Sequence, residues 1–534
     1  MESRQDILLE LNEITSSYKF LDVIVKLCDL NFNANINDLP SRDTQKLLNI
    51  NEIVFLLGLW LKNKSRESYI ISSIADTAKL SNKLMNDLHY SFYEGNITPD
   101  SEEEFKASMV NGSSLQETIF YSGTGAYDYQ YVQNFKLKYG LDKLWLLENK
   151  KFSVESVLDF FTFFKAIFHY RINVKKLKGD MLNTFTYCKK SFIFERYPEF
   201  YTIIKDLAID LEGTFNQDFN SIGDANIFSY KPVLETKTDF IIPLPYMLAE
   251  AIYESPFYWM LEDENYKSIA FENRGNSAEK IVKHELSKVF PLEAIHTNVL
   301  VKKNRGNTIT DIDVCIKYDD ALIIFQVKSK KLTQLSKQGN SAQVKKDFQN
   351  AVEDAYDQAF KCYEPILNNT VKLVDKDFNI LIETESIKKI YSACIVLDSY
   401  PPILAHSRIF YYENEIVPIA MSIFDLEMLT TYLESPSIFI EYITKRTELS
   451  KYFLADNELS YLKYYLNTGL KMPEDADIVY LNNNFAQYFD HDYYLKLITI
   501  NERRFPQFIK GIGRNQSCFC GSGKKYKTCC AAIM

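Results

Sequence analysis

The sequence is poor in residues that break regular structure. Its 534 residues include 17 glycines and 15 prolines, against 37 phenylalanines and 36 tyrosines. Together with 46% hydrophobic and 25% charged residues, this composition excludes wholesale disorder and fibrous folds. We expect well-filled cores, few long flexible linkers and, at ~150 residues per domain, about three or four domains.

Long apolar runs are also missing. No stretch approaches the roughly 20 apolar residues that a membrane-spanning helix needs, and Ile53–Leu61 is among the longest. The first residues, MESRQDILLELNEI, mix both charges and do not resemble a signal peptide. The sequence therefore predicts a cytoplasmic protein with no membrane partner.

The chain lacks an excess of positive charge. With 61 Lys and Arg against 71 Asp and Glu, its net charge is −10, so a nucleic-acid partner would have to meet a local basic patch. A GxxxxGK[ST] phosphate loop is absent, which argues against a P-loop ATPase. The six histidines are isolated in sequence, and we interpret them as packing or surface residues.

Changes in hydrophobic periodicity divide the chain into five segments, which predict a multidomain protein of the α + α/β class. For example, the apolar spacing from Ile7 to Leu21 predicts one helix. The expected segments are a helical N-terminal domain (1–242), a connecting segment (243–270), a mixed α/β core (271–424), a helical extension (425–510) and a small cysteine-rich tail (511–534).

The most informative part of the core is an expected hairpin. Two β-rich runs, Ile309–Tyr318 and Ala321–Lys330, meet at the turn Asp319–Asp320. Strand side chains alternate between the two faces of a sheet. Gln326 and Lys328 therefore share a face, and the pairing places them beside Asp313.

An acid, an amide and an ammonium group in one place suit phosphodiester hydrolysis. Mg²⁺ (or Mn²⁺) prefers oxygen ligands and activates a bound water, which a nearby Lys can orient. We expect Asp313 to be the anchoring ligand, Gln326 a weaker one, Lys328 the group beside the water, and Glu279 the ligand completing the shell. Glu272 and Glu285 compete with Glu279, and Asp311 competes with Asp313. The alternative is an edge hairpin with a solvated Asp and Lys.

At these residues the chain resembles the PD-(D/E)XK nuclease superfamily, especially its Mrr-like, restriction-endonuclease-like branch. The matching residues are GNSAEKIV with Glu279, IDV with Asp313, and QVK with Gln326 and Lys328. The resemblance spans about 271–424. It implies a restriction-endonuclease-like core and a Mg²⁺-dependent mechanism in which each matched residue has the family's role. Gln326 departs from the usual Glu or Asp, although the Mrr-like branch shares it.

Two further features of the core bear on nucleic acid. Between Glu272 and Gln349 there are fourteen Lys and Arg against nine Asp and Glu, which supports a phosphate-binding surface. The helix expected over Ser341–Ile366 carries Gln358. Its spacing to Tyr363 does not match the Gln/Tyr motif of some nucleases, so we predict a solvated face there and no catalytic role.

The nine cysteines form two groups. Five are scattered in apolar surroundings and are expected to be reduced core thiols: Cys28, Cys188, Cys315, Cys362 and Cys394. The other four, Cys518, Cys520, Cys529 and Cys530, lie within thirteen residues and predict a tetrahedral Zn²⁺ site. The tail GRNQSCFCGSGKKYKTCC resembles the SEC-C zinc-binding motif. Its basic residues suggest that it docks onto nucleic acid or a partner protein.

The sequence thus favours a metal-dependent endonuclease, with DNA preferred over RNA. A role in bacterial anti-phage defence rests on analogy with restriction enzymes alone. Two alternatives remain open. One is a non-catalytic binding protein with an inactive nuclease core, and the other is a SEC-C adaptor in translation or protein quality control.

Overall fold

The structure, a computed structural model, describes residues 3–32, 47–92, 112–121, 125–175, 182–398, 404, 417–455 and 457–532. The chain forms two compact units. Unit 1 comprises Met1–Ile97, Tyr127–Ala270 and His491–Met534, and unit 2 comprises Thr98–Ala126 and Phe271–Asp490. Both units are discontinuous in sequence, unlike the five consecutive segments predicted from the hydrophobic periodicity.

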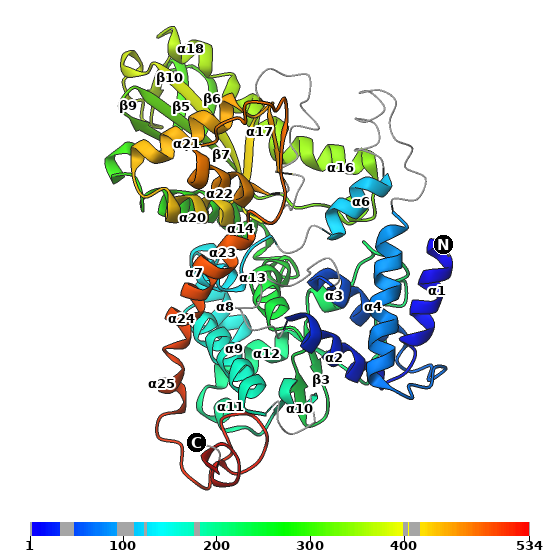
Figure 1. Cartoon of the computed structure of the whole chain (residues 1–534). Helices are drawn as coiled ribbons and strands as arrows, with labels where there is room; N and C mark the ends of the chain where they lie inside the picture. The colour runs from blue at the N-terminus through cyan, green and yellow to red at the C-terminus, as the bar shows by residue number, and fades with distance from the viewer. Residues whose placement is uncertain are drawn as a thin grey trace. The chain divides into compact units, whose positions relative to one another are not determined.

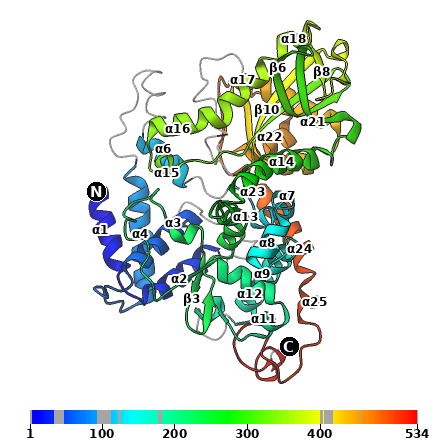
Figure 2. The same cartoon turned by 180° about the vertical axis from the view of Figure 1, so that it is seen from behind.

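Unit 1 is mainly helical. Its longer helices are α1 (Arg4–Ile14), α2 (Phe20–Phe32), α3 (Ile50–Asn63), α4 (Ile74–Tyr90), α7 (Asp128–Lys138), α8 (Lys143–Lys150), α9 (Ser156–Lys175), α12 (Pro198–Asp206), α13 (Pro245–Leu261) and α24 (Leu495–Glu502). Helix α9 contacts α7, α12, α13 and α24 (Figure 1; Figure 2). Its face bearing Phe160, Phe161 and Phe164 is buried, so aromatic packing holds this bundle together.

The helix predicted from Ile7 to Leu21 is two helices. Helix α1 ends at Ile14, and α2 begins at Phe20. The Thr15 hydroxyl donates to the Leu11 carbonyl at 2.8 Å. Three hydroxyl residues follow Ile14 directly, and such side chains compete with the helix for backbone partners. The apolar spacing continues because both helices bury one face in the same core.

Unit 1 also contains a small sheet, which the prediction of a helical N-terminal domain did not include. Its order is β1-β4-β3-β2. The strands are β1 (Thr186–Cys188), β2 (Ala208–Asp210), β3 (Val233–Glu235) and β4 (Asp239–Ile241). Strands of three residues are too short to show a two-residue hydrophobic alternation, so the sequence pattern could not reveal them.

Unit 2 is built on a seven-stranded mixed sheet of order β11-β10-β7-β6-β5-β8-β9. The strands are β5 (Ile295–Asn304), β6 (Asn307–Tyr318), β7 (Ala321–Lys328), β8 (Lys372–Val374), β9 (Ile380–Ile382), β10 (Lys389–Val396) and β11 (Ile419–Ser422). Strand β10 runs parallel to β7 and to β11, and the other pairs are antiparallel. The predicted hairpin is present, with Tyr318 opposite Ala321 and Val314 opposite Phe325.

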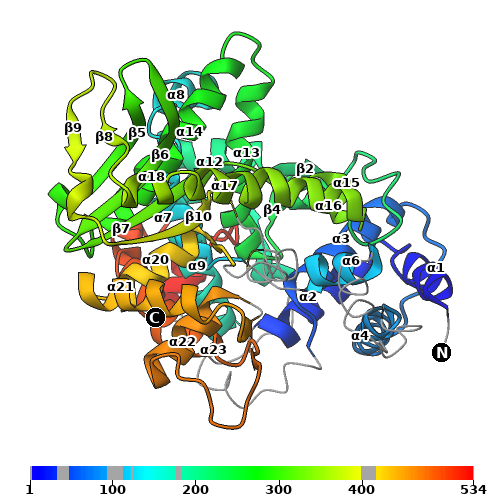
Figure 3. The same ribbon diagram turned by 90° about the horizontal axis from the view of Figure 1, so that it is seen from above.

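Helices cover both faces of this sheet (Figure 3). On one face lie α16 (Ser341–Phe348), α17 (Asp354–Phe360) and α18 (Tyr363–Leu367). On the other lie α20 (Ile423–Tyr432), α21 (Pro436–Glu448) and α22 (Glu458–Thr468). Helix α14 (Lys267–Leu286) leads into the sheet, and α6 (Gly112–Tyr121) packs near α15 (Gln334–Lys337) and α16. A π-turn at Gln349–Glu353 interrupts the long helix predicted over Ser341–Ile366.

The segment after the sheet is not purely helical, because it includes the parallel pair β12 (Phe453–Ala455) and β13 (Val479–Leu481). Short elements complete the chain: α10 (Leu182–Phe185), α11 (Phe192–Arg196), α23 (Gln487–Phe489), α25 (Phe505–Ile509) and single 3₁₀ or π turns. Over the described residues, no helix combines the length and the apolar character that crossing a bilayer requires.

Candidate functional site

The first candidate site lies where the β6–β7 ladder stops. The last paired residues are Val314 and Phe325. One residue further along, the Asp313 carboxylate accepts a hydrogen bond from the Val327 backbone N–H at 2.7 Å. Burial raises the pKa of Asp313 above its ordinary value, although this hydrogen bond and the charge of Lys328 oppose the shift. The carboxylate is thus fixed in place but only partly stabilised as an anion.

Gln326 lies beside it and is 1% exposed. Its Nε2 donates to the Asp311 backbone carbonyl at 2.9 Å. Its Oε1 is buried and has no hydrogen-bond partner among the described residues. A buried carbonyl oxygen without a partner is costly, so this oxygen is a ready acceptor for a cation or a water.

Lys328 is held by a residue to which the sequence analysis gave no role. Its Nζ is 3.2 Å from Oε1 of Gln358 on α17, and Gln358 Nε2 donates to Asp311 Oδ1 at 2.8 Å. Gln358 is therefore half-buried in this site and not on a solvated face. The buried residues Ala351, Ala355, Ala359 and Cys362 mark the sheet-facing side of this helical run. The spacing of these residues in the sequence, with Gln358 next to Ala359, could have indicated that Gln358 lies near the sheet.

Glu279, on α14, faces the same end of the sheet. Its Oε2 accepts from Asn298 Nδ2 at 3.1 Å. Burial raises the pKa of Glu279, and the charge of Asp313 raises it further. Its two competitors lie elsewhere, because Glu272 is exposed and Glu285 is buried against Lys288. Nothing in the sequence pattern singled out Asn298.

The structure thus brings Glu279, Asp313, Gln326 and Lys328 to one end of the sheet, with Asp311 bound to Gln358 beside them. The acids do not form a compact ligand group. In the described parts of the chain, the one group of three or more His, Cys, Asp or Glu side chains close enough to hold a metal ion is the C-terminal cysteine cluster. The site on the sheet offers the carboxylates of Glu279 and Asp313, with Asp311 nearby, and the amide of Gln326. These groups are spaced more widely than the cysteine Sγ atoms.

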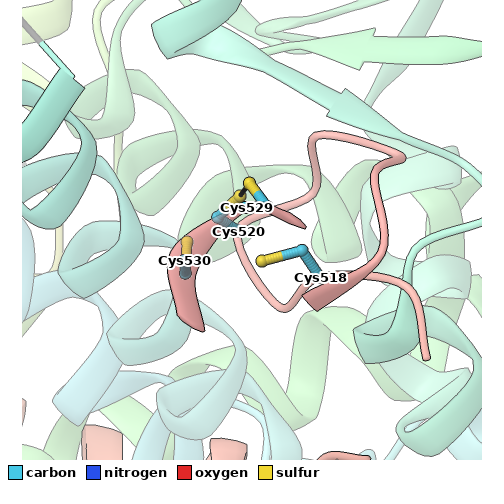
Figure 4. Close-up of side chains that lie close together, drawn as sticks. All are labelled: Cys518, Cys520, Cys529 and Cys530. Carbon is cyan, nitrogen blue, oxygen red and sulfur yellow. Dashed lines mark hydrogen bonds between the residues drawn. The ribbon is translucent and has the colours of Figure 1, made fainter. Parts of the chain in front are cut away.

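The second candidate site is that cluster of Cys518, Cys520, Cys529 and Cys530. All four side chains are buried and turn toward one another (Figure 4). Their Sγ atoms lie within 4.8 Å of one another, and those of Cys520 and Cys529 are 3.5 Å apart. Tetrahedral zinc, with Zn–S bonds of about 2.3 Å, spaces its sulfurs by about 3.8 Å. The four cysteines could therefore hold a metal such as zinc.

Local backbone structure forms this cluster. Ser517 pairs with Lys525 in an isolated bridge, and the Cys518 N–H donates to the Lys524 carbonyl at 2.7 Å. The turn between them contains Gly521 and Gly523, both with φ of +70°, a conformation that other residues rarely adopt. The thiols crowd one another, and the contact with Cys520 is the first cause that raises the pKa of Cys518 to about 12. A bound cation would reverse this effect, because it favours thiolates.

The tail is packed onto the rest of unit 1. The Cys188 N–H donates to the Gly521 carbonyl at 2.7 Å, and the ring of Phe519 lies 5.7 Å from that of Tyr170 and 6.0 Å from that of Phe505. A side chain at position 521 would lie 2.9 Å from Arg171. Cys188, expected to be a core thiol, is only half-buried and lies beside Gly523. The other four scattered cysteines are buried.

Comparison with known proteins characterises the tail. Residues 514–532 match the SEC-C motif. A UPF0225 protein of Photorhabdus laumondii is 35% identical over 75 residues, which cover 14% of this chain. The chain thus spans 44% of that relative's length. No solved structure gives a significant match. The PD-(D/E)XK resemblance therefore stays a prediction.

Proposed function

We propose that the protein is a metal-dependent nuclease that hydrolyses phosphodiester bonds in DNA at the end of the β6–β7 hairpin. The observation that carries this proposal is the buried, unpartnered Oε1 of Gln326 beside the half-buried carboxylate of Asp313. The fold leaves an oxygen acceptor unsatisfied next to an acid whose pKa is raised by burial. Both costs are relieved when a hard cation binds between them.

The donor set fits magnesium or manganese. Asp313 and Gln326 would supply two oxygen ligands, and Glu279 a third, directly or through water. Mg²⁺ is commonly bound by one or two carboxylates with waters and substrate phosphate filling the other positions, so a loose group of acids is compatible with it. When bound, the ion would polarise the phosphate and acidify a water.

The surrounding residues would position the reacting groups. Lys328 donates a hydrogen bond to Gln358, and its charge lowers the pKa of Asp313. In the proposed reaction its ammonium group orients the attacking water and offsets the charge that develops on the phosphate. Gln358 holds Lys328 and Asp311 together and is a positioning residue. The Val327 N–H fixes the Asp313 carboxylate.

The test is cleavage of supercoiled plasmid and of linear duplex DNA with Mg²⁺ or Mn²⁺. The wild type is compared with Asp313→Asn, which keeps an oxygen acceptor for the Val327 N–H. The matched control is Asp320→Asn, an exposed acid at the opposite end of the same hairpin. We expect the control to cut like the wild type and Asp313→Asn to be inactive. A folded wild type that cuts no nucleic acid with either metal would refute the proposal and favour the non-catalytic alternative.

We propose a structural role for the cysteine cluster, with zinc as its ion. Four cysteine ligands saturate a tetrahedral zinc and leave no position for substrate. The contacts of the tail with Cys188, Tyr170 and Phe505 suggest that the ion secures the C-terminal residues to unit 1. Arg514, Lys524, Lys525 and Lys527 remain exposed, which is compatible with the predicted docking to a further partner.

A further inference from the structure

The hairpin formed by β5 and β6 extends past its neighbours in the sheet. The two strands pair as far as Asn304 and Asn307, with Arg305 and Gly306 forming the turn. On one side, β7 pairs with β6 only from Val314 onward. On the other, β8 pairs with β5 only from Leu300 to Lys302. The hairpin residues beyond this pairing, Lys303 to Asn307, are therefore a ribbon of two strands, and Lys302 lies at its base beside β8.

This ribbon is basic and carries no compensating acids. No Asp or Glu occurs between Glu293 and Asp311. Lys303 and Arg305 are exposed, and Lys302 is half-exposed. Among the described residues, none of the three forms an ion pair with a carboxylate. In a chain of net charge −10, a hairpin tip with three unpaired cations is an unusual concentration of positive charge.

The neighbouring hairpin adds to this surface. Strand β8 lies beside β5, and β9 lies beyond β8 at the edge of the sheet (Figure 3). The Arg305 guanidinium lies 5.6 Å from the ring centroid of Phe378, and Lys372 Nζ lies 5.8 Å from the same ring. Such contacts orient both cations without neutralising them. Asp375 and Asp377 are in the same turn as Phe378. The Asn379 amide and backbone N–H donate to the Asp375 carboxylate and stabilise its negative charge, so this hairpin contributes acids as well as Lys372.

The tip and the candidate active site are at the same end of the sheet. Strand β6 starts at the tip and reaches Asp311 four residues after Asn307. At about 3.4 Å per residue, Asp311 lies roughly 14 Å from the tip and Asp313 about 20 Å from it. A duplex whose backbone is at Asp313 would thus be within reach of Arg305.

We propose that the β5–β6 hairpin tip, with Lys302, Lys303 and Arg305, inserts into the major groove of duplex DNA and holds it against the site at Asp313. This inference rests on the proposed nuclease function and names its substrate form. A two-stranded ribbon fits the major groove of B-form DNA, which is about 12 Å wide. The deep, narrow major groove of A-form RNA does not admit it.

The test is equilibrium binding of a fluorescein-labelled DNA duplex of about 30 base pairs, roughly three helical turns, over a salt series without added Mg²⁺. The variant is Lys303→Gln with Arg305→Gln. The matched control is Lys388→Gln with Lys389→Gln, two exposed lysines at the opposite end of the sheet, where Lys389 lies beside Ala321. An RNA duplex of the same sequence is measured in parallel.

We expect the tip variant to bind DNA about tenfold or more weakly, with a salt slope reduced by roughly two, since each phosphate contact contributes about 0.9. The control should bind like the wild type, and the RNA duplex should bind weakly to all three proteins. Equal affinities of the tip variant and the control would overturn the inference. So would RNA binding that equals DNA binding and depends on the same residues.

The two proposals fail in different ways. If the wild type cleaves DNA but the tip variant behaves like the control, only the hairpin inference is wrong. If the wild type binds duplex DNA through the tip but cleaves nothing with Mg²⁺ or Mn²⁺, the nuclease proposal is wrong and the binding surface stands.

Discussion

The end of the β6–β7 hairpin and the C-terminal cysteine cluster differ in how complete their ligand sets are. The cysteines place four buried Sγ atoms within 4.8 Å of one another. At the hairpin, Gln326 Oε1 has no hydrogen-bond partner within the described part of the chain, and Glu279 and Asp313 each accept a hydrogen bond from another residue. A structural metal site is normally closed by protein ligands, whereas a catalytic site leaves positions for water and substrate. This difference agrees with the roles proposed for them, a structural metal at the cysteines and a catalytic one at the hairpin.

The largest expected effect is a loss of cleavage activity when the hairpin site is changed. Lys328→Ala should lower the rate of plasmid cleavage on the order of a thousandfold, because the ammonium group that positions the water and offsets charge is lost. The measurement is single-turnover cleavage, with Lys330→Ala as the matched control two residues further along and exposed. An equal loss in both variants would show that general positive charge, and not a positioned ammonium, is required.

The next largest effect is a loss of thermal stability when the cysteine cluster is changed. Cys520→Ser should lose the bound zinc and reduce the Tm by about 5 °C or more, because metal binding contributes to folding. Cleavage measured well below that Tm should persist. Metal analysis and thermal unfolding test this, with Cys188→Ser as the control beside the tail. Retention of stoichiometric zinc by Cys520→Ser would contradict the four-cysteine site.

A third change alters the Mg²⁺ requirement of the hairpin site. Gln326→Glu places a charged ligand where the unsatisfied amide oxygen lies, so the Mg²⁺ concentration for half-maximal cleavage should fall about tenfold. A Mg²⁺ titration of the cleavage rate measures this. An unchanged Mg²⁺ requirement in an active variant would mean that position 326 does not contact the ion.

The smallest effect concerns pH. Burial raises the folded-state pKa of Asp313 and Glu279 above the unfolded values. Without Mg²⁺, the protonated forms of these two acids therefore contribute their full stability below the unfolded pKa, near 4. This contribution is lost as the pH rises through the raised folded pKa and the buried carboxyl groups ionise. Asp313→Asn removes one such acid and should raise the Tm at pH 7 by about 2 °C.

Thermal unfolding between pH 4 and pH 8, without added Mg²⁺, measures this difference. The gain of Asp313→Asn over the wild type should shrink toward the acidic end of the range. A variant that is less stable than the wild type at neutral pH would show that the buried carboxylate is satisfied without a metal.

The features that depend on a local sequence pattern, the β6–β7 hairpin and the cysteine cluster, could be predicted from the sequence. Two β-rich runs flank the short turn Asp319–Asp320, so the hairpin and the proximity of Asp313 to Gln326 followed from its register. The spacing of the four cysteines gave the tail cluster in the same way. The spacing of the buried alanines indicated that Gln358 lies near the sheet, but the partners of Gln358 and Asn298 could not be predicted, because these contacts join separate segments of the chain. The residues that hold the candidate site residues in place therefore depend on tertiary contacts.

The interleaving of the two units has a consequence for biosynthesis. Residues of unit 1 are made both before and after most of unit 2. On the ribosome, the sheet of unit 2 can assemble while unit 1 still waits for the segment from His491 onward. The four cysteines and the backbone that contacts Cys188 are thus synthesised after the whole of that sheet. Nascent chains stalled before residue 491 would carry a folded sheet and an unfinished helical unit.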